Sequence, residues 1–317
     1  MNCDIDNLLS ANIVLTSNCN SRCKSCDYWR HKGENLSLEK IKYFFEILKK
    51  YNTESIVLTG GEPTLHPQFY KILEMAKCEY GFITILSTNG TTIPLIFEKV
   101  CDLVDSFCIS FDGATPEEYA AIRGIDNFQN IMTSIHRIKS YNSNIQVWLS
   151  CLIQRMNFDH LESIYDTALQ SEADGIFFNV PELKPGCFGR NEAYAPSREM
   201  LISVDSISLL ERIFLEIQRK DTNTHFLCQS ASAFENFVEY FKVMNNLVKP
   251  KCRKCYVPYN TITLTETGQI KPCFYIDYAM ELTADPVNSP KMKAFRSLMH
   301  SDKTVQEQCD YCGQFNS

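Results

Sequence analysis

The chain has 317 residues, of which 44% are hydrophobic, and its mean hydropathy of −0.20 is typical of a globular protein. The formal net charge of −7 and the isoelectric point near 5.5 weigh against a nucleic-acid partner. No run approaches the ~18 apolar residues of a membrane span, and the first residues lack a signal-peptide profile, so we expect a cytoplasmic protein without a membrane partner. Its 15 cysteines then indicate metal ligation or reactive thiols, because cytosolic thiols stay reduced.

Short apolar runs of strand type alternate with longer stretches of helical period up to about residue 220. The predicted strands are 11–17, 55–60, 82–87, 104–111, 145–153 and 175–180. The predicted helices are 37–50, with Ser37 as N-cap, then 67–77, 93–101, 116–140, 158–171 and 204–219. Six β/α units are fewer than the eight of a closed barrel, so we expect an α/β fold with an open, partial (β/α)6 TIM-like barrel. Chemistry in such barrels gathers at the carboxyl ends of the strands.

Three cysteines follow the first predicted strand, at Cys19, Cys23 and Cys26. Three sulfur ligands so close in sequence can cap one face of an iron–sulfur cube and leave its fourth iron open to a small molecule. A structural zinc site or reduced buried thiols would account for the same residues.

The ends of the next strands carry glycine and polar residues. The second ends in Gly60, Gly61, Glu62 and Pro63, where the glycines let the backbone approach a ligand and the carboxylate can accept from an ammonium group. Asn89 follows the third strand, Ser110 ends the fourth, and Arg123 follows a little later. Each of these alone also fits turn chemistry or a surface charge, but together and in order they indicate a binding site.

Together, the CxxxCxxC spacing and these strand ends resemble the radical S-adenosylmethionine (SAM) superfamily. The resemblance implies a [4Fe–4S] cluster on Cys19, Cys23 and Cys26, and reductive cleavage of SAM to a 5′-deoxyadenosyl radical, with flavodoxin or ferredoxin as electron donor. It also implies that Gly60 to Pro63 bind the methionyl amino group, that Ser110 and Arg123 contact the ribose or carboxylate, and that Asn89 lies nearby. The family often has an aromatic residue where this chain has Ser25, so Tyr28 or Trp29 is expected to contact the adenine.

A second group of cysteines lies near the carboxyl end. Cys255 and Cys273 flank a predicted hairpin over 259–270, and a CxxC motif follows at Cys309 and Cys312. Four thiolates in this arrangement suit zinc or an iron–sulfur cluster. After the first cysteine motif, the arrangement resembles the twitch form of the SPASM extension, which implies one auxiliary [4Fe–4S] cluster on these four residues. The expected domains are a barrel over 1–225 and a small twitch-type domain, a β-hairpin plus helix, over 226–317.

Cys252 is left over, and three roles stay open for it: a hydrogen-atom donor to a carbon radical, a cluster ligand in place of Cys255, or neither. Asn179, Glu182 and Lys184 follow the sixth strand and are expected either at the mouth of the barrel or in a solvated loop.

Three functions stay open. No peptide-recognition domain is expected before the barrel, which favours a small sugar or aminocyclitol-type substrate, as in the twitch-type aminocyclitol dehydrogenase and the related aminoglycoside epimerase. On this view, hydrogen is abstracted from a carbinol carbon, and the outcome is epimerisation, with Cys252 as donor, or dehydrogenation, with an electron passing to the auxiliary cluster. The second is a maturase that modifies a ribosomally made precursor peptide, and the third is a non-enzymatic zinc-binding adaptor.

Overall fold

Six parallel strands form the main part of the fold. The computed structural model describes residues 4–183, 186, 188–190, 198–250, 255–299, 309 and 312. The strands are β1 (Ser10–Thr16), β2 (Ser55–Gly60), β3 (Ile83–Thr88), β4 (Ser106–Ser110), β5 (Gln146–Leu152) and β6 (Gly175–Asn179). All six predicted strands are confirmed, with ends that agree within two residues.

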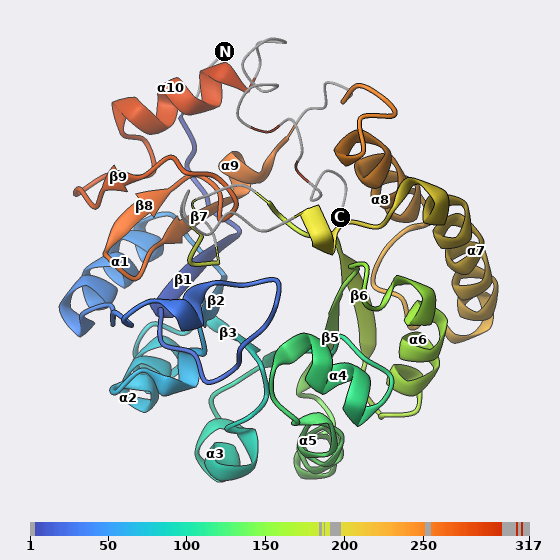
Figure 1. The fold of residues 1–317 in the computed structure, drawn as a ribbon. Helices are drawn as coiled ribbons and strands as arrows, with labels where there is room; N and C mark the ends of the chain where they lie inside the picture. Colours follow the sequence, from blue (N-terminus) through green and yellow to red (C-terminus); the bar gives the residue numbers. More distant parts are fainter. Residues whose placement is uncertain are drawn as a thin grey trace.

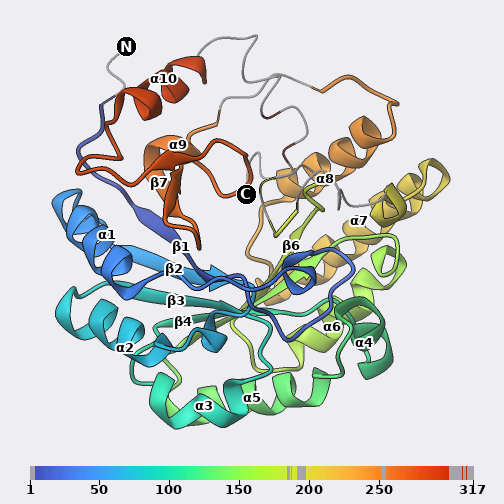
Figure 2. The same ribbon diagram turned by 60° about the vertical axis from the view of Figure 1, so that its left-hand side comes forward.

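The sheet continues beyond β1 into the carboxyl-terminal hairpin. Its strand order is β6-β5-β4-β3-β2-β1-β7-β8-β9, so β6 and β9 form its edges and the sheet is not closed. The additional strands are β7 (Thr261–Leu264), β8 (Gln269–Lys271) and β9 (Met280–Glu281). The predicted hairpin is confirmed as the antiparallel pair β7 and β8, but the parallel pairing of β7 with β1 was not predicted. The hairpin is therefore part of the barrel sheet (Figure 2).

Helices surround the outer, convex side of the sheet (Figure 1). The helices of the described residues are α1 (Leu38–Lys50), α2 (Phe69–Glu74), α3 (Ile93–Val100), α4 (Pro116–Arg123), α5 (Phe128–Tyr141), α6 (Leu161–Leu169), α7 (Ile207–Thr224), α8 (Ala231–Met244), α9 (Val257–Asn260) and α10 (Pro290–Leu298), and of these α9 leads directly into β7. A π-helical turn, Met75–Glu79, continues α2, and single 3₁₀ turns cover Tyr28–Arg30, Pro63–Leu65, Phe158–His160, Arg198–Met200 and Val204–Ser206. The predicted cap of α1 is confirmed, because the Ser37 hydroxyl accepts from the N–H of Lys40. In the described part of the chain, no helix is long and apolar enough to span a bilayer.

The single helix predicted over 116–140 was wrong, because the structure has two helices there. Helix α4 ends at Gly124, which adopts the left-handed conformation with φ of +69°. Glycine takes this conformation without the steric cost of a side chain. The chain then turns and begins α5 at Phe128.

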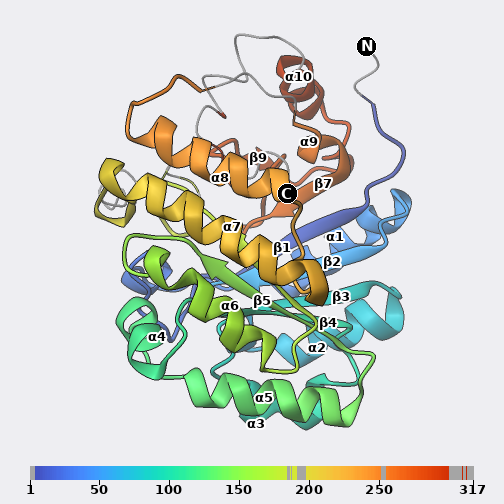
Figure 3. The same cartoon turned by 90° about the vertical axis from the view of Figure 1, so that its right-hand side faces the viewer.

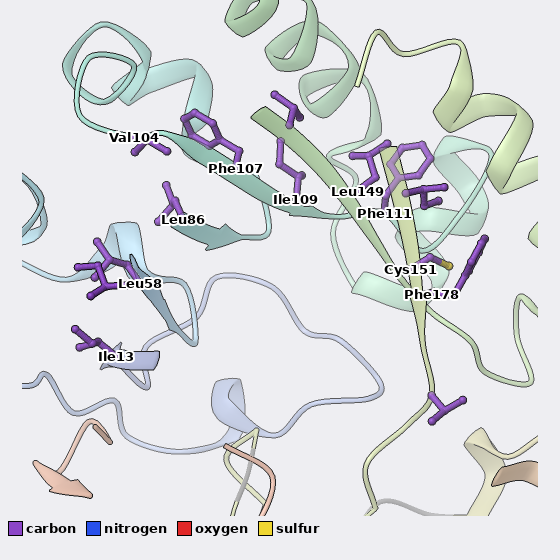
Figure 4. Packing of buried hydrophobic residues seen from close by; sticks show 14 of the residues in the cluster. Ile13, Leu58, Leu86, Val104, Phe107, Ile109, Phe111, Leu149, Cys151 and Phe178 are labelled. Carbon is purple, nitrogen blue, oxygen red and sulfur yellow. The ribbon is translucent and has the colours of Figure 1, made fainter. Parts of the chain in front are cut away.

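The core lies between the sheet and the helices, and strand periodicity decides which side chains join it. Ile13, Leu58, Leu86, Ile109 and Leu149 are fully buried against the helices (Figure 4). Side chains of alternate parity, such as those of Asn12, Thr59, Ser87, Ser110 and Ser150, are only half-buried and face the inner side of the sheet. The inner face of the barrel is thus polar at the carboxyl ends of its strands.

Helix α8 comes after the predicted domain boundary at residue 225, yet it packs with the helices of the barrel. It lies beside α7 (Figure 3), with the Phe214 and Phe234 rings 4.5 Å apart. Leu227 forms a bridge with Ile176 of β6. The two-domain division stays a prediction, and Leu227 and β7 of the expected second domain pair with strands of the barrel.

Candidate active site

The loop that follows β1 carries the three cysteines, and the end of α4 holds it in place. The N–H groups of Arg22 and Lys24 donate to the carbonyls of Arg123 and Ile122, at 3.0 and 3.1 Å. Gly124 lies so close to this loop that a Cβ there would be 2.6 Å from the Arg22 carbonyl oxygen. Two backbone hydrogen bonds therefore fix the segment around Cys23.

The three thiols lie close enough to influence one another electrostatically. Burial, reinforced by Cys23, raises the pKa of Cys19 to about 11 and that of Cys26 to about 12. Burial also raises the pKa of Cys23, while the charge of Arg123 acts in the opposite direction. Within the described residues, no three His, Cys, Asp or Glu side chains are placed to share a single metal ion. An iron–sulfur cluster does not require its cysteines to share one metal ion, because each cysteine binds a separate iron atom.

The turn after β2 packs closely on the start of the cysteine loop. The N–H groups of Gly61 and Glu62 donate to the carbonyls of Thr16 and Asn18, both at 2.7 Å. A Cβ on Gly60 or Gly61 would lie 2.3 or 2.2 Å from those same two oxygens. Glycine is thus required at both positions for the two strand ends to meet. Pro63 is buried and begins the 3₁₀ turn that follows.

Glu62 is fully buried and bonded to its own chain. Its Oε1 accepts from the hydroxyls of Thr64 and Thr88, at 2.6 and 2.8 Å, and its Oε2 accepts from the N–H of Asn89 at 2.8 Å. The carboxylate therefore joins the ends of β2 and β3, and its role in binding an ammonium group stays a prediction.

Asn89 holds the cysteine loop from the other side. Its amide nitrogen donates to Asn20 Oδ1 at 2.8 Å and to Ser21 Oγ at 2.9 Å, and lies 3.9 Å from Cys19 Sγ. The side chain is 3% exposed. Asn89 therefore lies against the cysteine loop, and its place near SAM stays a prediction.

Arg123 forms a buried ion pair with Asp112, with 3.0 Å between Nη1 and Oδ2. Asp112 is in turn fixed by the N–H of Leu152, which donates to Oδ1 at 2.7 Å. Arg123 Nε is buried and has no hydrogen-bond partner among the residues that the structure describes. This donor, close to Cys23, is available to an anionic ligand. Asp112 was not predicted as a site residue, because its Asp-Gly context is typical of a turn.

Ser110 lies half-buried at the end of β4, directly opposite Ser150 of β5. The Asn179 amide donates to Ser150 Oγ at 3.2 Å, so a polar row crosses three strand ends. Of the other predicted mouth residues, Glu182 is buried, with 7% exposed, and Lys184 lies outside the described residues.

Tyr28 and Trp29 follow the cysteine loop in a single 3₁₀ turn. Tyr28 is 4% exposed, whereas Trp29 is half-buried and donates from Nε1 to the Cys23 carbonyl at 3.2 Å. Trp29 is therefore bonded to the cysteine loop, and the contact of either ring with an adenine stays a prediction.

The second cysteine site is formed by segments far apart in sequence. Cys255, Cys273 and Cys309 lie in one cluster with Ile276, Tyr278, Phe295 and Met299. Burial raises the pKa of Cys273 to about 12, and Cys255 and Cys309 raise it further. Cys312 follows, with its N–H donating to the Cys309 carbonyl at 3.1 Å. Cys252 lies outside the described residues.

A cavity of about 410 Å³ is lined by residues that follow each cysteine site in the sequence, among them Tyr28 and Phe274. Its walls are the turn after the cysteine loop, the segment after β6, and the inner face of β7 and β8. They include the polar side chains of Ser17, Glu34, Thr263, Thr265, Glu266, Gln269 and Asp277. The volume lies within the range of small-molecule sites.

Residues 13–168 match the family model described as the radical SAM superfamily. The chain belongs to this superfamily. Radical SAM enzymes use a [4Fe–4S] cluster and SAM, and the cysteine loop contains thiol ligands of the required type beside an unpaired buried Arg123 donor. The chain therefore fits these cofactors, and it is a radical SAM enzyme.

Curated relatives cover most of this radical SAM chain. A probable GTP 3′,8-cyclase of Saccharolobus islandicus is 25% identical over 269 residues, which is 83% of this chain and 82% of the relative. A protein of the same name from Sulfolobus acidocaldarius is 26% identical over 277 residues, covering 84% and 80% of the two chains.

Solved structures share the fold. Streptococcus suis SuiB bound to its precursor peptide SuiA has a TM-score of 0.66 at 14% identity, covering 92% of this chain and 67% of SuiB. The structure of anSMEcpe with bound AdoMet has a TM-score of 0.68 at 17% identity, covering 92% and 84%. These likenesses support the partial radical SAM barrel.

Proposed function

We propose that this radical SAM enzyme abstracts a hydrogen atom from a carbinol carbon of a small sugar or aminocyclitol-type substrate. The observation that carries the proposal is the cavity lined by Tyr28, which follows the first cysteine motif, and by Phe274, which follows Cys273. Its walls offer hydroxyl and amide groups from Ser17, Thr263, Thr265 and Gln269, which suit the hydroxyls of a polyol.

Side chains of both charges line the cavity. The carboxylates are Glu34, Glu266 and Asp277, and the basic side chains are His31, Lys32, Arg190 and Lys271. Lys271 donates to the carbonyls of Gly186 and Phe274. The carboxylates are the groups that would bind the ammonium group of an aminosugar.

Cys19, Cys23 and Cys26 would hold the [4Fe–4S] cluster. When bound, the cluster and SAM supply a 5′-deoxyadenosyl radical. The protein would orient SAM: Gly60 and Gly61 would bring the backbone close, Arg123 would offer its Nε–H to a carboxylate, and Ser110 would contact a ribose hydroxyl. Tyr28 or Trp29 would contact the adenine. A flavodoxin or ferredoxin would serve as electron donor.

We assign Cys255, Cys273, Cys309 and Cys312 to an auxiliary [4Fe–4S] cluster of the SPASM/twitch type. Support comes from the clustering of three of these thiols and from the fold shared with SuiB and anSMEcpe. Epimerisation would return one hydrogen atom to the substrate carbon, and a thiol such as Cys252 is the candidate donor. Dehydrogenation would instead remove a second electron and a proton from the same carbinol.

The test is anaerobic turnover of the reconstituted enzyme with aminocyclitols, among them 2-deoxystreptamine, in deuterated water. A substrate should stimulate formation of 5′-deoxyadenosine. Solvent deuterium on carbon would indicate epimerisation, and a new carbonyl dehydrogenation. Cys252→Ala should keep the full iron content yet lose the epimerised product if Cys252 is the donor, whereas loss of one cluster would make it a ligand. Failure of every aminocyclitol and aminosugar, with stimulation by another class, would reject the proposal.

Two other substrate classes are the alternatives. The names of the curated relatives favour a purine nucleoside triphosphate, whose phosphates would meet both the carboxylates and the cations Lys32 and Lys271 of the cavity. The neighbours that were solved with peptides favour a precursor peptide. The same assay with GTP and Mg²⁺, and a short precursor gene beside this one, would distinguish them. Since the chain is a radical SAM enzyme, a zinc-binding adaptor is the least favoured interpretation.

A further inference from the structure

One residue after β6 touches both cysteine sites. The Phe188 carbonyl accepts from the N–H of Asp27 at 2.9 Å and lies 3.5 Å from Cys26 Sγ. The Phe188 ring lies 5.3 Å from that of Phe274 and 6.2 Å from that of Tyr275, the two residues that follow Cys273. This short segment therefore lies between the two cysteine sites.

Arg190 is the buried cation of the same segment. Its side chain is 5% exposed, its Nη2 donates to the Ser25 carbonyl, and its guanidinium lies 5.1 Å above the Phe188 ring. The hydrogen bond to Ser25 places this charge one residue from Cys26. A guanidinium is always ionised, so the positive charge is permanent.

The same charge reaches the neighbourhood of the second site. The Phe188 ring that the Arg190 guanidinium faces packs against Phe274 and Tyr275, which follow Cys273. Arg190 and Phe274 also line the same cavity. One fixed cation is therefore placed to influence both cysteine sites.

We propose that Arg190 is the shared cation of the two cysteine sites and raises the reduction potentials of the clusters held there. The proposal rests on the proposed function for the second cluster, but not for the first. Each cluster takes up one electron from an external low-potential reductant, and the added negative charge is stabilised by a nearby cation. At an effective dielectric constant of about 20, one charge at roughly 10 Å changes such an equilibrium by about tenfold. For one electron, tenfold corresponds to about 59 mV.

The experiment is a potentiometric titration of the anaerobically reconstituted full-length enzyme, with titanium(III) citrate as reductant and cluster EPR as the readout. Arg190→Gln should lower both potentials by about 59 mV or more, whereas Arg190→Lys keeps the charge and should stay close to wild type. Arg30→Gln is the matched control, because Arg30 follows the same cysteine loop but is exposed and paired with Asp27.

Two results would overturn the proposal. One is wild-type potentials in Arg190→Gln at full iron content. The other is an equal change of the reduction potentials in Arg190→Lys and Arg190→Gln, which would show that Arg190 acts through its contacts and not through its charge. If Arg190→Gln fails to take up iron, the Arg190→Lys variant provides the test. Wild-type reduction potentials in Arg190→Lys support the shared cation, and potentials lowered by about 59 mV reject it. Iron content is measured alongside, so about four irons per chain would reject the second cluster without affecting the test on the first.

Discussion

Glu62 accepts a hydrogen bond at 2.8 Å from the backbone N–H of Asn89, which joins the end of β2 to the end of β3. Asn89 in turn donates to Ser21 in the cysteine loop after β1. Three consecutive strand ends are therefore tied together by two side chains.

Glu62→Gln should destabilise this connection, because the amide replaces one acceptor oxygen by a donor facing other donors. We expect the free energy of unfolding to fall by about 1–3 kcal/mol and SAM to bind more weakly. Urea unfolding and equilibrium dialysis with SAM measure both. Glu54→Gln, at an exposed position just before β2, is the control and should change neither. A Glu62→Gln protein as stable as wild type would show that the carboxylate does not brace the strand ends.

Arg123→Lys should weaken SAM binding, because lysine can keep the charge beside Asp112 but lacks the Nε–H that is unpaired in this structure. A charged hydrogen bond contributes about 1.5–3 kcal/mol, which corresponds to a rise in Kd of about tenfold or more. Isothermal titration with SAM measures this Kd. Arg137→Lys, at an arginine without an assigned role in the site, is the control. Unchanged affinity would mean that Arg123 Nε does not contact SAM.

Gly124→Ala should disturb the cysteine loop through the backbone. The new Cβ would require a left-handed alanine and would lie 2.6 Å from the Arg22 carbonyl oxygen. We expect about 1–3 kcal/mol of lost stability and reduced iron uptake. Gly81→Ala is a matched control, since its φ is +68° but nothing lies within 4 Å of its added Cβ. Equal losses in the two variants would show that backbone strain alone, and not contact with the loop, is responsible.

Cys273→Ala should remove one cluster and leave the other. Iron content should fall from about eight to about four per chain, while SAM cleavage to 5′-deoxyadenosine persists, because the three cysteines after β1 are untouched. Cys101→Ala, a buried thiol at the end of α3, should keep all the iron. Full iron in Cys273→Ala would exclude this residue as a ligand.

Asp105 should give a measurable pH dependence of stability. Burial alone would raise its pKa, but the hydrogen bonds from Lys77 and from the N–H of Thr84 outweigh it, and the pKa lies below the ordinary 3.8. The stabilisation is therefore present above that value and is lost as the pH falls through the lowered pKa.

Asp105→Asn should lower the free energy of unfolding by about 1 kcal/mol at pH 7. The loss is no larger because the ion pair with Lys77 is half-exposed and screened by solvent. Urea unfolding at a series of pH values should show the difference from wild type shrinking below about pH 4. A difference that stays constant into acid would mean that the ionised carboxylate contributes nothing.

Most of the barrel could be predicted from the sequence, because its strands are short apolar runs with local turn signals. The break at Gly124 could not, since the apolar stripe resumes after it and one glycine does not require a helix to end. The pairing of β7 with β1 could not be predicted either, because the sequence of the hairpin does not indicate which strand of the sheet it pairs with.

For the site, the sequence predicted residue types better than their contacts. The cysteine positions follow from spacing, and the structure brings Cys255, Cys273 and Cys309 together as expected. The internal bonding of Glu62 was not predictable, because its partners Thr88 and Asn89 come from another strand end. Arg190 was missed because it lies in a glycine-rich loop with no recognisable motif.

The central place of β1 in the sheet has a consequence for synthesis of the chain. β1 pairs on one side with β2, and on the other with β7, where Asn12 and Thr263 are 251 residues apart in the sequence. Until the ribosome has made the hairpin, this edge of β1 is an open template for other chains. A nascent or truncated chain that stops before β7 is therefore expected to aggregate.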